Sequence, residues 1–350
     1  MIKEILHKAI MQKASDIHIA VGAAPTLRIN GSLLRAASAP LTEQDTLDMF
    51  QAITSSEQQL QFRNNCELDF AYVIDGCSRF RVNAYQQRGY VAMAIRVIEN
   101  QIASLHELGL PEVVKTLARM PRGLVLVTGP TGCGKSTTLA AMINLINNER
   151  AAHVVTLEEP IEYLHNHGKS IISQREIPTD SKSFLCGLKA ALREDPDVIL
   201  VGEMRDAETV STVITAAETG HLVLATLHTY DCAQSIDRVI DAFPSYQQPQ
   251  IRSQLSMTLQ GIISQQLLPR KDGLGRAVAV ETLVVTPAVR NLIREGKTHQ
   301  IASCIQTGAR SGMQTMELSL RDLYQRGLIA YEDALAYSMD KENFIRLINS

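Results

Sequence analysis

The stretch that decides the fold occupies residues 129–136 and reads Gly129-Pro130-Thr131-Gly132-Cys133-Gly134-Lys135-Ser136. It follows an apolar run at residues 124–127 and leads, through Thr137, into a segment with helical character. A strand, a glycine loop and a helix in this order form the setting of the phosphate-binding P-loop, G-x-x-x-x-G-K-[ST]. The alternative is a glycine-rich turn that matches the pattern by chance.

Each part of this loop has a chemical role toward a nucleotide. The glycines let backbone N–H groups approach phosphates without a Cβ in the way, and the helix N-terminus attracts negative charge. Lys135 can reach the β- and γ-phosphates, while the Ser136 hydroxyl can ligate Mg²⁺. We therefore expect residues 129–137 to bind the phosphates of a nucleotide together with Mg²⁺.

Length, charge and cysteine spacing narrow the class of protein. A chain of 350 residues is long enough for two domains, each with its own core. The net charge of −3 gives no reason to expect non-specific binding of nucleic acid. The six cysteines are scattered without a C-x-x-C pair, which argues against a zinc site and favours reduced thiols in a cytosolic protein. The apolar runs are too short to span a membrane, so any membrane role must come through a partner.

Hydrophobic periodicity predicts a small first domain. Apolar residues recur at helical spacing over residues 2–10, and strands with alternating apolar side chains are expected at 80–84 and 91–97. The pair Asn30-Gly31 predicts a hairpin turn. Residues 1–98 therefore predict an α+β domain.

The pattern changes after a polar stretch, which predicts a linker over residues 99–110. Residues 111–286 alternate buried strands with helices, as in a mostly parallel sheet covered by helices, an α/β fold. The strands are expected at 124–127, 153–157, 198–201 and 222–227, and the helices near 137–147, 181–193, 207–218 and 233–242. Such a fold binds its ligand at the carboxyl ends of the strands. Residues 287–350 predict a helical appendage.

Acidic residues follow two more of the predicted strands. Glu203 lies just past one strand, where P-loop enzymes need a carboxylate to hold Mg²⁺ directly or through water. Glu158, Glu159 and Glu162 follow another, and one of them could serve as the base or orienting group for an attacking water. A solvated acidic loop is the alternative at each place.

Histidines and arginines complete the candidate site. His228 falls at the carboxyl end of a strand, where its imidazole could hydrogen-bond a γ-phosphate and report its presence. His221, at the other end of that strand, is equally compatible with a structural role. Arg79 and Arg81 share one strand face and Arg96 lies on another strand; an arginine can supply positive charge to a phosphoryl group from a second domain or subunit. From the pattern alone, a solvated basic face is the simpler explanation.

The order of these pieces resembles that of the secretion ATPases of the type II/type IV pilus superfamily, and more narrowly the type IV pilus retraction ATPases, the PilT family. The resemblance runs nearly end to end. The segments that carry it are Lys13-Ala14-Ser15-Asp16-Ile17-His18, an Asp box at 158–162, a Walker B segment at 193–206, a His box at 220–229, and a C-terminal motif at 288–295 tied to retraction. Assembly and type II secretion relatives usually carry paired cysteines and an extra N-terminal domain, and neither is found in this sequence.

The resemblance implies a PAS-like N-terminal domain, a RecA-like P-loop ATPase domain and a set of roles. Glu162 would be the general base, Glu203 would organise Mg²⁺ and water, and Arg81 and Arg96 would act as arginine fingers across a subunit interface. The expected protein is a cytoplasmic, homohexameric, Mg²⁺-dependent ATPase that drives pilus retraction and twitching motility.

The resemblance also implies the partners of this motor. It would act on the inner-membrane platform protein of the pilus machine, alone or beside a paralogous retraction ATPase, touching the membrane only indirectly and no nucleic acid. An ATP-binding ring that is a structural accessory to another motor is the alternative function.

Three residues depart from the family pattern. Glu159 stands in the Asp box where Asp is expected, and Val289 replaces a more usual Ile. Cys133 stands in the P-loop where Ser is commoner. The helix N-terminus could activate this thiol, in which case its oxidation would inhibit nucleotide binding.

Overall fold

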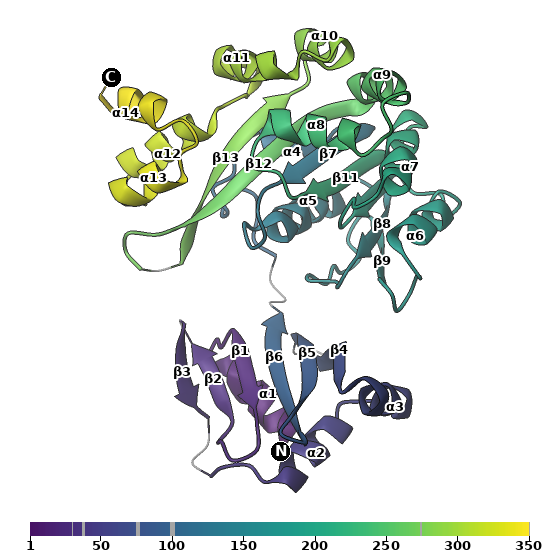
Figure 1. Ribbon diagram of the computed structural model, residues 1–350, viewed down its shortest axis with the longest axis vertical. Coiled ribbons are helices and arrows are strands. Elements are labelled where there is room, and N and C mark those ends of the chain that lie inside the picture. The colour runs from purple at the N-terminus through teal and green to yellow at the C-terminus, as the bar shows by residue number, and fades with distance from the viewer. Residues whose placement is uncertain (30, 37–38, 75–77, 99–101, 274, 350) are drawn as a thin grey trace. The chain divides into compact units, whose positions relative to one another are not determined.

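The computed structural model describes residues 1–29, 31–36, 39–74, 78–98, 102–273 and 275–349. The chain divides into two compact units, Met1–Gln101 and Ile102–Ser350 (Figure 1). Residues 99–101 of the predicted linker, and Asn30 of the predicted turn, lie outside the described residues. Leu105 and Leu110 are buried in the core of the second unit, so packing there begins within the stretch predicted as a linker.

The first unit combines an antiparallel sheet with three helices. Within the described residues, the sheet has six strands in the order β3-β2-β1-β6-β5-β4. Its elements are α1 (Ile2–Met11), β1 (Asp16–Ile19), β2 (Thr26–Ile29), β3 (Ser32–Arg35), α2 (Glu43–Gln51), α3 (Ser56–Asn65), β4 (Glu67–Ile74), β5 (Ser78–Gln87) and β6 (Tyr90–Ile98). Apolar side chains from all three helices and from the sheet form one buried cluster, so this unit has a core of its own, as expected of the α+β part.

Strand β5 shows how alternation orients the arginines of this unit. Phe80 and Val82 are fully buried, whereas Arg81 between them is exposed. Arg79 is only 9% exposed. The interpretation of Arg79 and Arg81 as one solvated basic face is therefore wrong for Arg79.

The second unit is built on a sheet whose strand order is β13-β12-β7-β11-β10-β8-β9, counting the strands that the structure describes. The strands are β7 (Gly123–Thr128), β8 (His153–Glu158), β9 (Ile171–Glu176), β10 (Val198–Val201), β11 (Leu222–Leu227), β12 (Leu259–Pro269) and β13 (Arg276–Val284). All neighbours pair in parallel except β12 and β13, which form an antiparallel hairpin. The predicted α/β fold with a mostly parallel sheet is confirmed.

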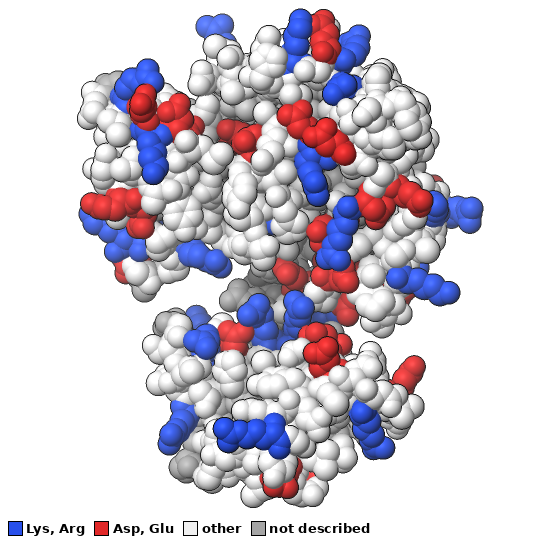
Figure 2. All heavy atoms as spheres, viewed as in Figure 1, with Lys and Arg blue, Asp and Glu red and all other residues white. Residues whose placement is uncertain are grey.

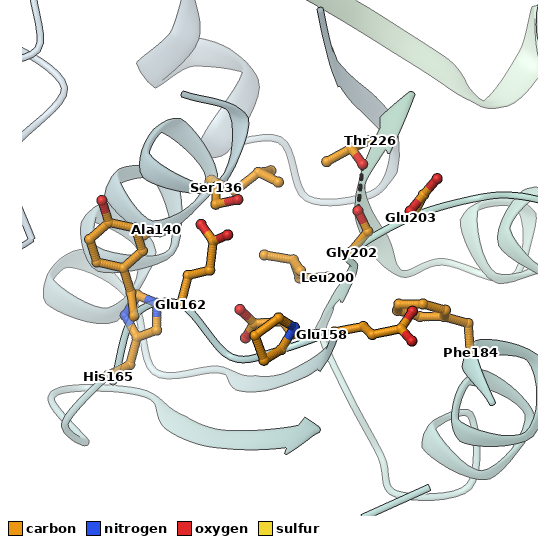
Figure 3. A pocket seen from close by; sticks show the side chains of 14 residues that line it. Ser136, Ala140, Glu158, Glu162, His165, Phe184, Leu200, Gly202, Glu203 and Thr226 are labelled. Atoms are coloured by element: carbon orange, nitrogen blue, oxygen red, sulfur yellow. Dashed lines mark hydrogen bonds between the residues drawn. The ribbon is translucent and has the colours of Figure 1, made fainter. Parts of the chain in front are cut away.

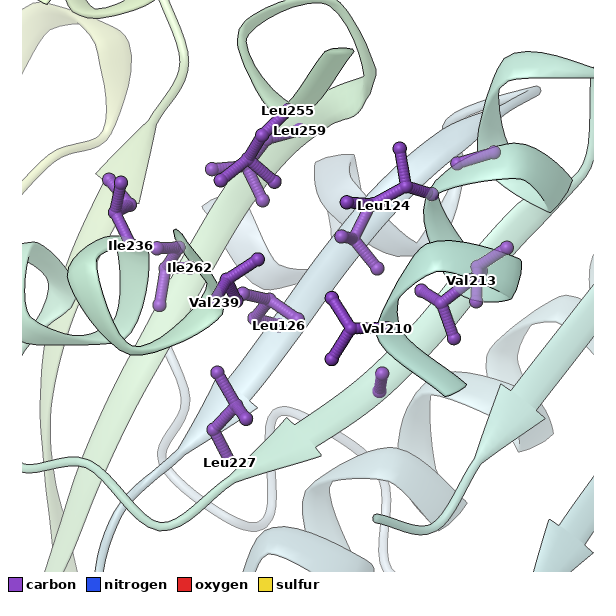
Figure 4. Close-up of a cluster of buried hydrophobic side chains, with 14 of the residues drawn as sticks. Leu124, Leu126, Val210, Val213, Leu227, Ile236, Val239, Leu255, Leu259 and Ile262 are labelled. Carbon is purple, nitrogen blue, oxygen red and sulfur yellow. The ribbon is translucent and has the colours of Figure 1, made fainter. Parts of the chain in front are cut away.

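Helices cover both faces of this sheet. They are α4 (Val113–Ala118), α5 (Lys135–Glu149), α6 (Phe184–Ala191), α7 (Ala207–Glu218), α8 (Cys232–Asp241) and α9 (Gln248–Thr258). Leu124 and Leu126 of β7 pack with α7, α8 and α9, as Figure 4 shows, while Val125 and Val127 point to the other face and pack with α4 and α5. Such burial on both sides explains why the strands are apolar throughout.

Side-chain caps set several helix boundaries. The Asp206 carboxylate accepts a 2.8 Å hydrogen bond from the Thr209 N–H and caps α7, whose bounds match the predicted 207–218. Helix α6 is shorter than predicted because Ser183 caps its start, accepting from the Cys186 N–H.

The C-terminal helices pack on the β12–β13 hairpin. They are α10 (Pro287–Glu295), α11 (Ile301–Thr307), α12 (Met316–Gln325), α13 (Tyr331–Tyr337) and α14 (Lys341–Asn349), with 3₁₀ turns at Thr298–Gln300 and Ala309–Ser311. Leu268 of β12 and Ala279 of β13 share a buried cluster with Leu320 and Phe344. The hairpin thus links the P-loop sheet to this helical part. Among the described helices, none is long and apolar enough to cross a membrane.

Candidate active site

The P-loop joins the end of β7 to the start of α5. Gly129, Gly132 and Gly134 have φ values of 141°, 79° and 90°, which side chains disfavour. A Cβ at Gly129 would also lie 2.3 Å from the Gln265 carbonyl oxygen. The loop therefore needs glycine at these positions. Its geometry leaves the first N–H groups of α5, the positive end of the helix dipole, to bind an anion.

Lys135, His228 and Glu203 form a continuous polar chain beside the loop. Lys135 Nζ donates to the carbonyls of Gly129 and Pro130, at 2.8 and 3.0 Å, and lies 3.4 Å from His228 Nδ1. On the other side of the ring, Nε2 lies 3.4 Å from Glu203 Oε1. Because an ammonium group can only donate, Nδ1 accepts and Nε2 carries the proton that faces Glu203. Burial and then the Lys135 charge lower the pKa of His228, which favours this neutral ring.

Arg205 extends the chain beyond Glu203. Its Nη2 lies 2.8 Å from Glu203 Oε2 and its Nη1 lies 3.5 Å from Glu159 Oε2. The Arg205 side chain is 62% exposed, so these ion pairs contribute little to stability. They orient the Glu203 carboxylate and link the loops after β8 and β10. Glu203, Arg205 and His228 also line a neighbouring cavity of about 450 Å³.

Three of the predicted site residues line one cavity of about 90 Å³, which His228 does not line. Ser136 lies on its α5 side, Glu162 comes from the loop after β8, and Glu203 comes from the loop after β10 (Figure 3). The Glu162 side chain points toward Ser136 in this view. Thr226, which donates a hydrogen bond to the Gly202 carbonyl, lines the cavity as well. These side chains come together because parallel strands end at the same edge of a sheet.

The loop that carries Glu162 is held by hydrogen bonds to polar groups that are buried or partly buried. The Glu158 carboxylate accepts hydrogen bonds from the Thr156 hydroxyl (2.7 Å), the Gln174 amide (3.1 Å) and the Glu162 N–H. The Gln174 amide also donates to the Tyr163 carbonyl at 2.8 Å. Burial raises the pKa of Glu158, and this effect outweighs the hydrogen bonds, which lower it. Glu158 is therefore tied to the loop by hydrogen bonds, whereas the Glu162 side chain is exposed and lines the cavity.

Two further contacts tie this loop to its surroundings. The Tyr163 hydroxyl lies 2.9 Å from the Thr137 hydroxyl of α5, which links the base loop to the P-loop helix. His165 donates its backbone N–H to the Gln174 amide oxygen. Burial lowers the pKa of the His165 ring to about 4.

The donor set at this cavity fits Mg²⁺. The Ser136 hydroxyl and the carboxylates of Glu162 and Glu203 are hard oxygen donors, and they line the same cavity next to the P-loop. Mg²⁺ prefers such donors and is typically held by one or two protein groups, with water and phosphate oxygens completing the octahedron. Ser136 and Glu203, the predicted metal residues, both line this cavity.

Arg81 and Arg96 are cross-strand neighbours in the first unit, where β5 pairs with β6. Both are exposed. Arg96 Nε donates to Asp16 Oδ1 at 3.0 Å, and Arg28 Nε lies 4.0 Å from the other oxygen of this carboxylate. Asp16 thus fixes the direction of Arg96, and Arg81 and Arg96 lie side by side on the paired strands.

Other residues near the P-loop were not identified from the sequence. Gln265 of β12 contacts Cys133 and Thr138 through its side chain, and Arg276 of β13 donates to the Gly132 carbonyl at 3.3 Å. The sequence signal that could have identified Gln265 is a polar residue within a mostly apolar strand. Cys133 itself is 3% exposed, and burial raises the pKa of its thiol. The expectation of an activated thiol there is therefore wrong.

Comparison with known proteins places this geometry in a family. The family model described as "Type II/IV secretion system protein" matches residues 1–343. The chain is 46% identical, over 98% of its length and 99% of the relative's, to the type IV pilus retraction ATPase PilT of Pseudomonas aeruginosa. It is 47% identical to a twitching motility protein of Neisseria gonorrhoeae, over 91% and 85% of the two chains.

A solved structure agrees with these matches. The crystal structure of the pilus retraction motor PilT with bound ADP has a TM-score of 0.92 and 48% identity, and covers 98% of each chain. The predicted RecA-like fold, the nucleotide as ligand and the function as a pilus retraction ATPase are confirmed by these matches. The chain therefore belongs to the type II/IV secretion system protein family, and within it to the pilus retraction ATPases that its motifs resemble.

Proposed function

We propose that this protein is a cytoplasmic, Mg²⁺-dependent ATPase that works as a homohexamer and drives retraction by acting on the inner-membrane platform protein of the pilus machine. One observation carries the chemistry. Ser136, Glu162 and Glu203 line the same cavity beside the P-loop, so a hydroxyl ligand, a base and a second carboxylate face one space. This is the set of groups that hydrolysis of a nucleotide requires.

Binding begins at the P-loop. The N–H groups of the loop and of the first turn of α5 receive the phosphates. Lys135 exchanges its hydrogen bonds to the carbonyls of Gly129 and Pro130 for bonds to phosphate oxygens. Ser136 and Glu203 would hold Mg²⁺ here, and the metal would offset the negative charge of the phosphates.

Hydrolysis uses the exposed carboxylate of Glu162. It accepts a proton from water as the water oxygen bonds to the γ-phosphorus, and the bond from that phosphorus to the bridging oxygen of ADP breaks. Glu203 orients the water and would hold the metal. The supports under the base loop, Glu158 and Gln174, hold Glu162 in place during this step.

Arg81 and Arg96 of a neighbouring subunit complete the site. Their guanidinium groups offset the charge that develops on the transferred phosphoryl group, an effect that contributes a factor of about 10³–10⁵ to kcat in enzymes with arginine fingers. This sharing makes hydrolysis depend on the closing of one subunit onto another.

His228 links the nucleotide state to the carboxylate. While Lys135 contacts Nδ1, the opposite nitrogen faces Glu203. When Lys135 turns to a γ-phosphate, the ring is free to rotate and to donate its Nε2–H to this phosphate. Loss of the phosphate after hydrolysis restores the contacts of His228 with Lys135 and Glu203 and releases the closed state.

A phosphate-release assay tests the enzymatic part. Wild type should turn over ATP with Mg²⁺ and stop with EDTA. Glu162→Gln and Glu203→Gln should bind ATP but lower kcat by about 10² or more. Glu208→Gln, on the exposed first turn of α7, is the matched control and should keep wild-type activity. Turnover that is unchanged in EDTA, or in Glu162→Gln, would contradict the proposal.

A mixing experiment tests whether subunits share the site. Lys135→Ala subunits lack a working P-loop but carry intact fingers, and Arg96→Ala subunits have the reverse defect. Each variant alone should be nearly inactive. A mixed ring should regain part of the activity, because some interfaces combine an intact loop with an intact finger. No recovery in a confirmed mixed hexamer would rule out the shared site.

The accessory-ring alternative predicts nucleotide binding without the need for turnover. Twitching of a deletion strain distinguishes the two, since complementation by Glu203→Gln should fail for a motor and succeed for a scaffold.

A motor that acts on nucleic acid is disfavoured by the charge of the protein. Acidic and basic side chains are interspersed over the visible face of the second unit (Figure 2), and the net charge is −3.

A further inference from the structure

Gln265 of β12 contacts the P-loop through its side chain. It lies one residue past Ser264, which pairs with the last residue of β7, and its side chain is 1% exposed. Its amide Nε2 donates to the Cys133 carbonyl at 2.7 Å, and its Oε1 accepts from the Thr138 hydroxyl at 2.9 Å. A single buried amide thus joins the loop to the helix that follows it.

The backbone of Gln265 is equally close to the start of the loop. Its carbonyl oxygen lies 2.3 Å from the position that a Cβ at Gly129 would take, and its side-chain nitrogen lies 3.2 Å from the corresponding position at Gly134. The strand therefore touches the loop at its beginning and at its end. Arg276 of the paired strand β13 donates to the carbonyl of Gly132, in the middle of the loop.

The hydrogen bond to Cys133 determines how the next peptide group is turned. The peptide between Cys133 and Gly134 is trans, so its carbonyl and its N–H point in opposite directions. With the carbonyl drawn toward Gln265, the Gly134 N–H points away from β12. This N–H belongs to the group of donors on which a P-loop relies to bind phosphate.

We propose that Gln265 is a positioning residue for nucleotide binding, which holds the Cys133–Gly134 peptide so that its N–H faces the phosphates. This inference rests on the proposed function, because it assumes that the loop binds a nucleotide. It assigns a task to the β12–β13 hairpin, which also carries the C-terminal helices. The phosphate site is thereby built from both sides of the sheet edge rather than from β7 and α5 alone.

The chain offers a matched control one residue away. Gln266 is 7% exposed and lies next to Gln265 on β12. Because successive side chains of a strand point to opposite faces, it faces away from the loop. Gln265→Met and Gln266→Met make the same chemical change in the same buried strand, so they separate loop positioning from general damage to the sheet.

Isothermal titration with ADP, combined with thermal unfolding and steady-state ATPase kinetics, tests the proposal. We expect Gln265→Met to weaken ADP binding about tenfold, equal to about 1.4 kcal/mol, and to raise the KM for ATP more than it lowers kcat. Gln266→Met should bind ADP as wild type does. Thr138→Val, which removes the other partner of the amide, should also weaken ADP binding, and Thr138→Ser should restore it.

The outcomes are distinct. Wild-type ADP affinity in a folded Gln265→Met protein would overturn the proposal, and so would equal losses in the two methionine variants. If Gln265→Met does not fold, wild-type affinity in Thr138→Val overturns it. A wild-type protein that binds no ADP would instead refute the proposed function.

Discussion

Replacing Arg290 by alanine should destabilise the second unit, because this side chain joins two helices. Its Nη1 donates to the carbonyls of Ser256 and Met257, each at 2.9 Å, and its Nη2 lies 3.4 Å from Gln260 Oε1. The carbonyls belong to the last turn of α9, where helical partners are missing and a positive charge is favourable. Arg290, on α10, therefore caps α9.

The magnitude follows from these contacts. A hydrogen bond to a charged group contributes about 1.5–3 kcal/mol when buried. Arg290 is half-buried, so water can hydrate the carbonyls in the variant and the loss should lie at the low end. We expect a total of about 2 kcal/mol, which lowers the Tm of a unit of this size by about 4–8 °C.

Differential scanning calorimetry measures the effect, and the same helix provides the control. Arg294 lies one turn later and is exposed, so Arg294→Ala should change stability by less than about 0.5 kcal/mol. A Tm of Arg290→Ala within about 1 °C of wild type would refute the capping argument.

The pair also separates stability from function within the motif at 288–295. If the exposed face of α10 transmits motion, Arg294→Ala should keep its ATPase activity and lose twitching. The loss in Arg290→Ala should instead follow the amount of folded protein. Normal twitching in Arg294→Ala would remove that side chain from the transmission of motion.

Three further predictions concern the site and its pH dependence. Arg96→Ala should lower kcat by about 10³ or more and leave nucleotide affinity unchanged. Arg28→Ala removes the other arginine near the Asp16 carboxylate and should leave kcat unchanged. Equal losses of kcat in the two variants would argue against Arg96 as an arginine finger. His165 is protonated near pH 6.5 in the unfolded chain but only near pH 4 in the folded chain. The free energy of unfolding should therefore decrease as the pH falls from 6.5 to 4, by at most about 3 kcal/mol from this residue. His165→Phe should flatten urea unfolding midpoints over this range, and an unchanged slope would contradict the assignment. Tyr163→Phe removes the hydrogen bond to Thr137 and should reduce kcat severalfold with little change in ADP affinity, as measured by phosphate release and titration.

Local sequence patterns predicted the central helices and strands well, because residues at or next to each element determine where it begins and ends. Helix α7 begins where Asp206 caps it, and β7 is apolar because it is buried on both faces. The hairpin of β12 and β13 was missed. Strand β12 carries Ser264, Gln265 and Gln266 in its middle, and such polar residues hide a buried strand from a hydrophobicity pattern. They are tolerated because Ser264 donates to the Tyr230 carbonyl and Gln265 to the P-loop.

The amino-acid sequence by itself determined the chemical groups at the ends of the strands: a lysine after the glycine loop, carboxylates after two strands and an imidazole after another. Their roles follow from residue type and from spacing of a few positions. Only the tertiary structure decided that Lys135 and His228, 93 residues apart, lie 3.4 Å from one another, with Glu203 on the far side of the ring. The physical reason is the strand order β7-β11-β10-β8. This order arises from hydrogen bonding and packing between distant segments, which no local spacing records.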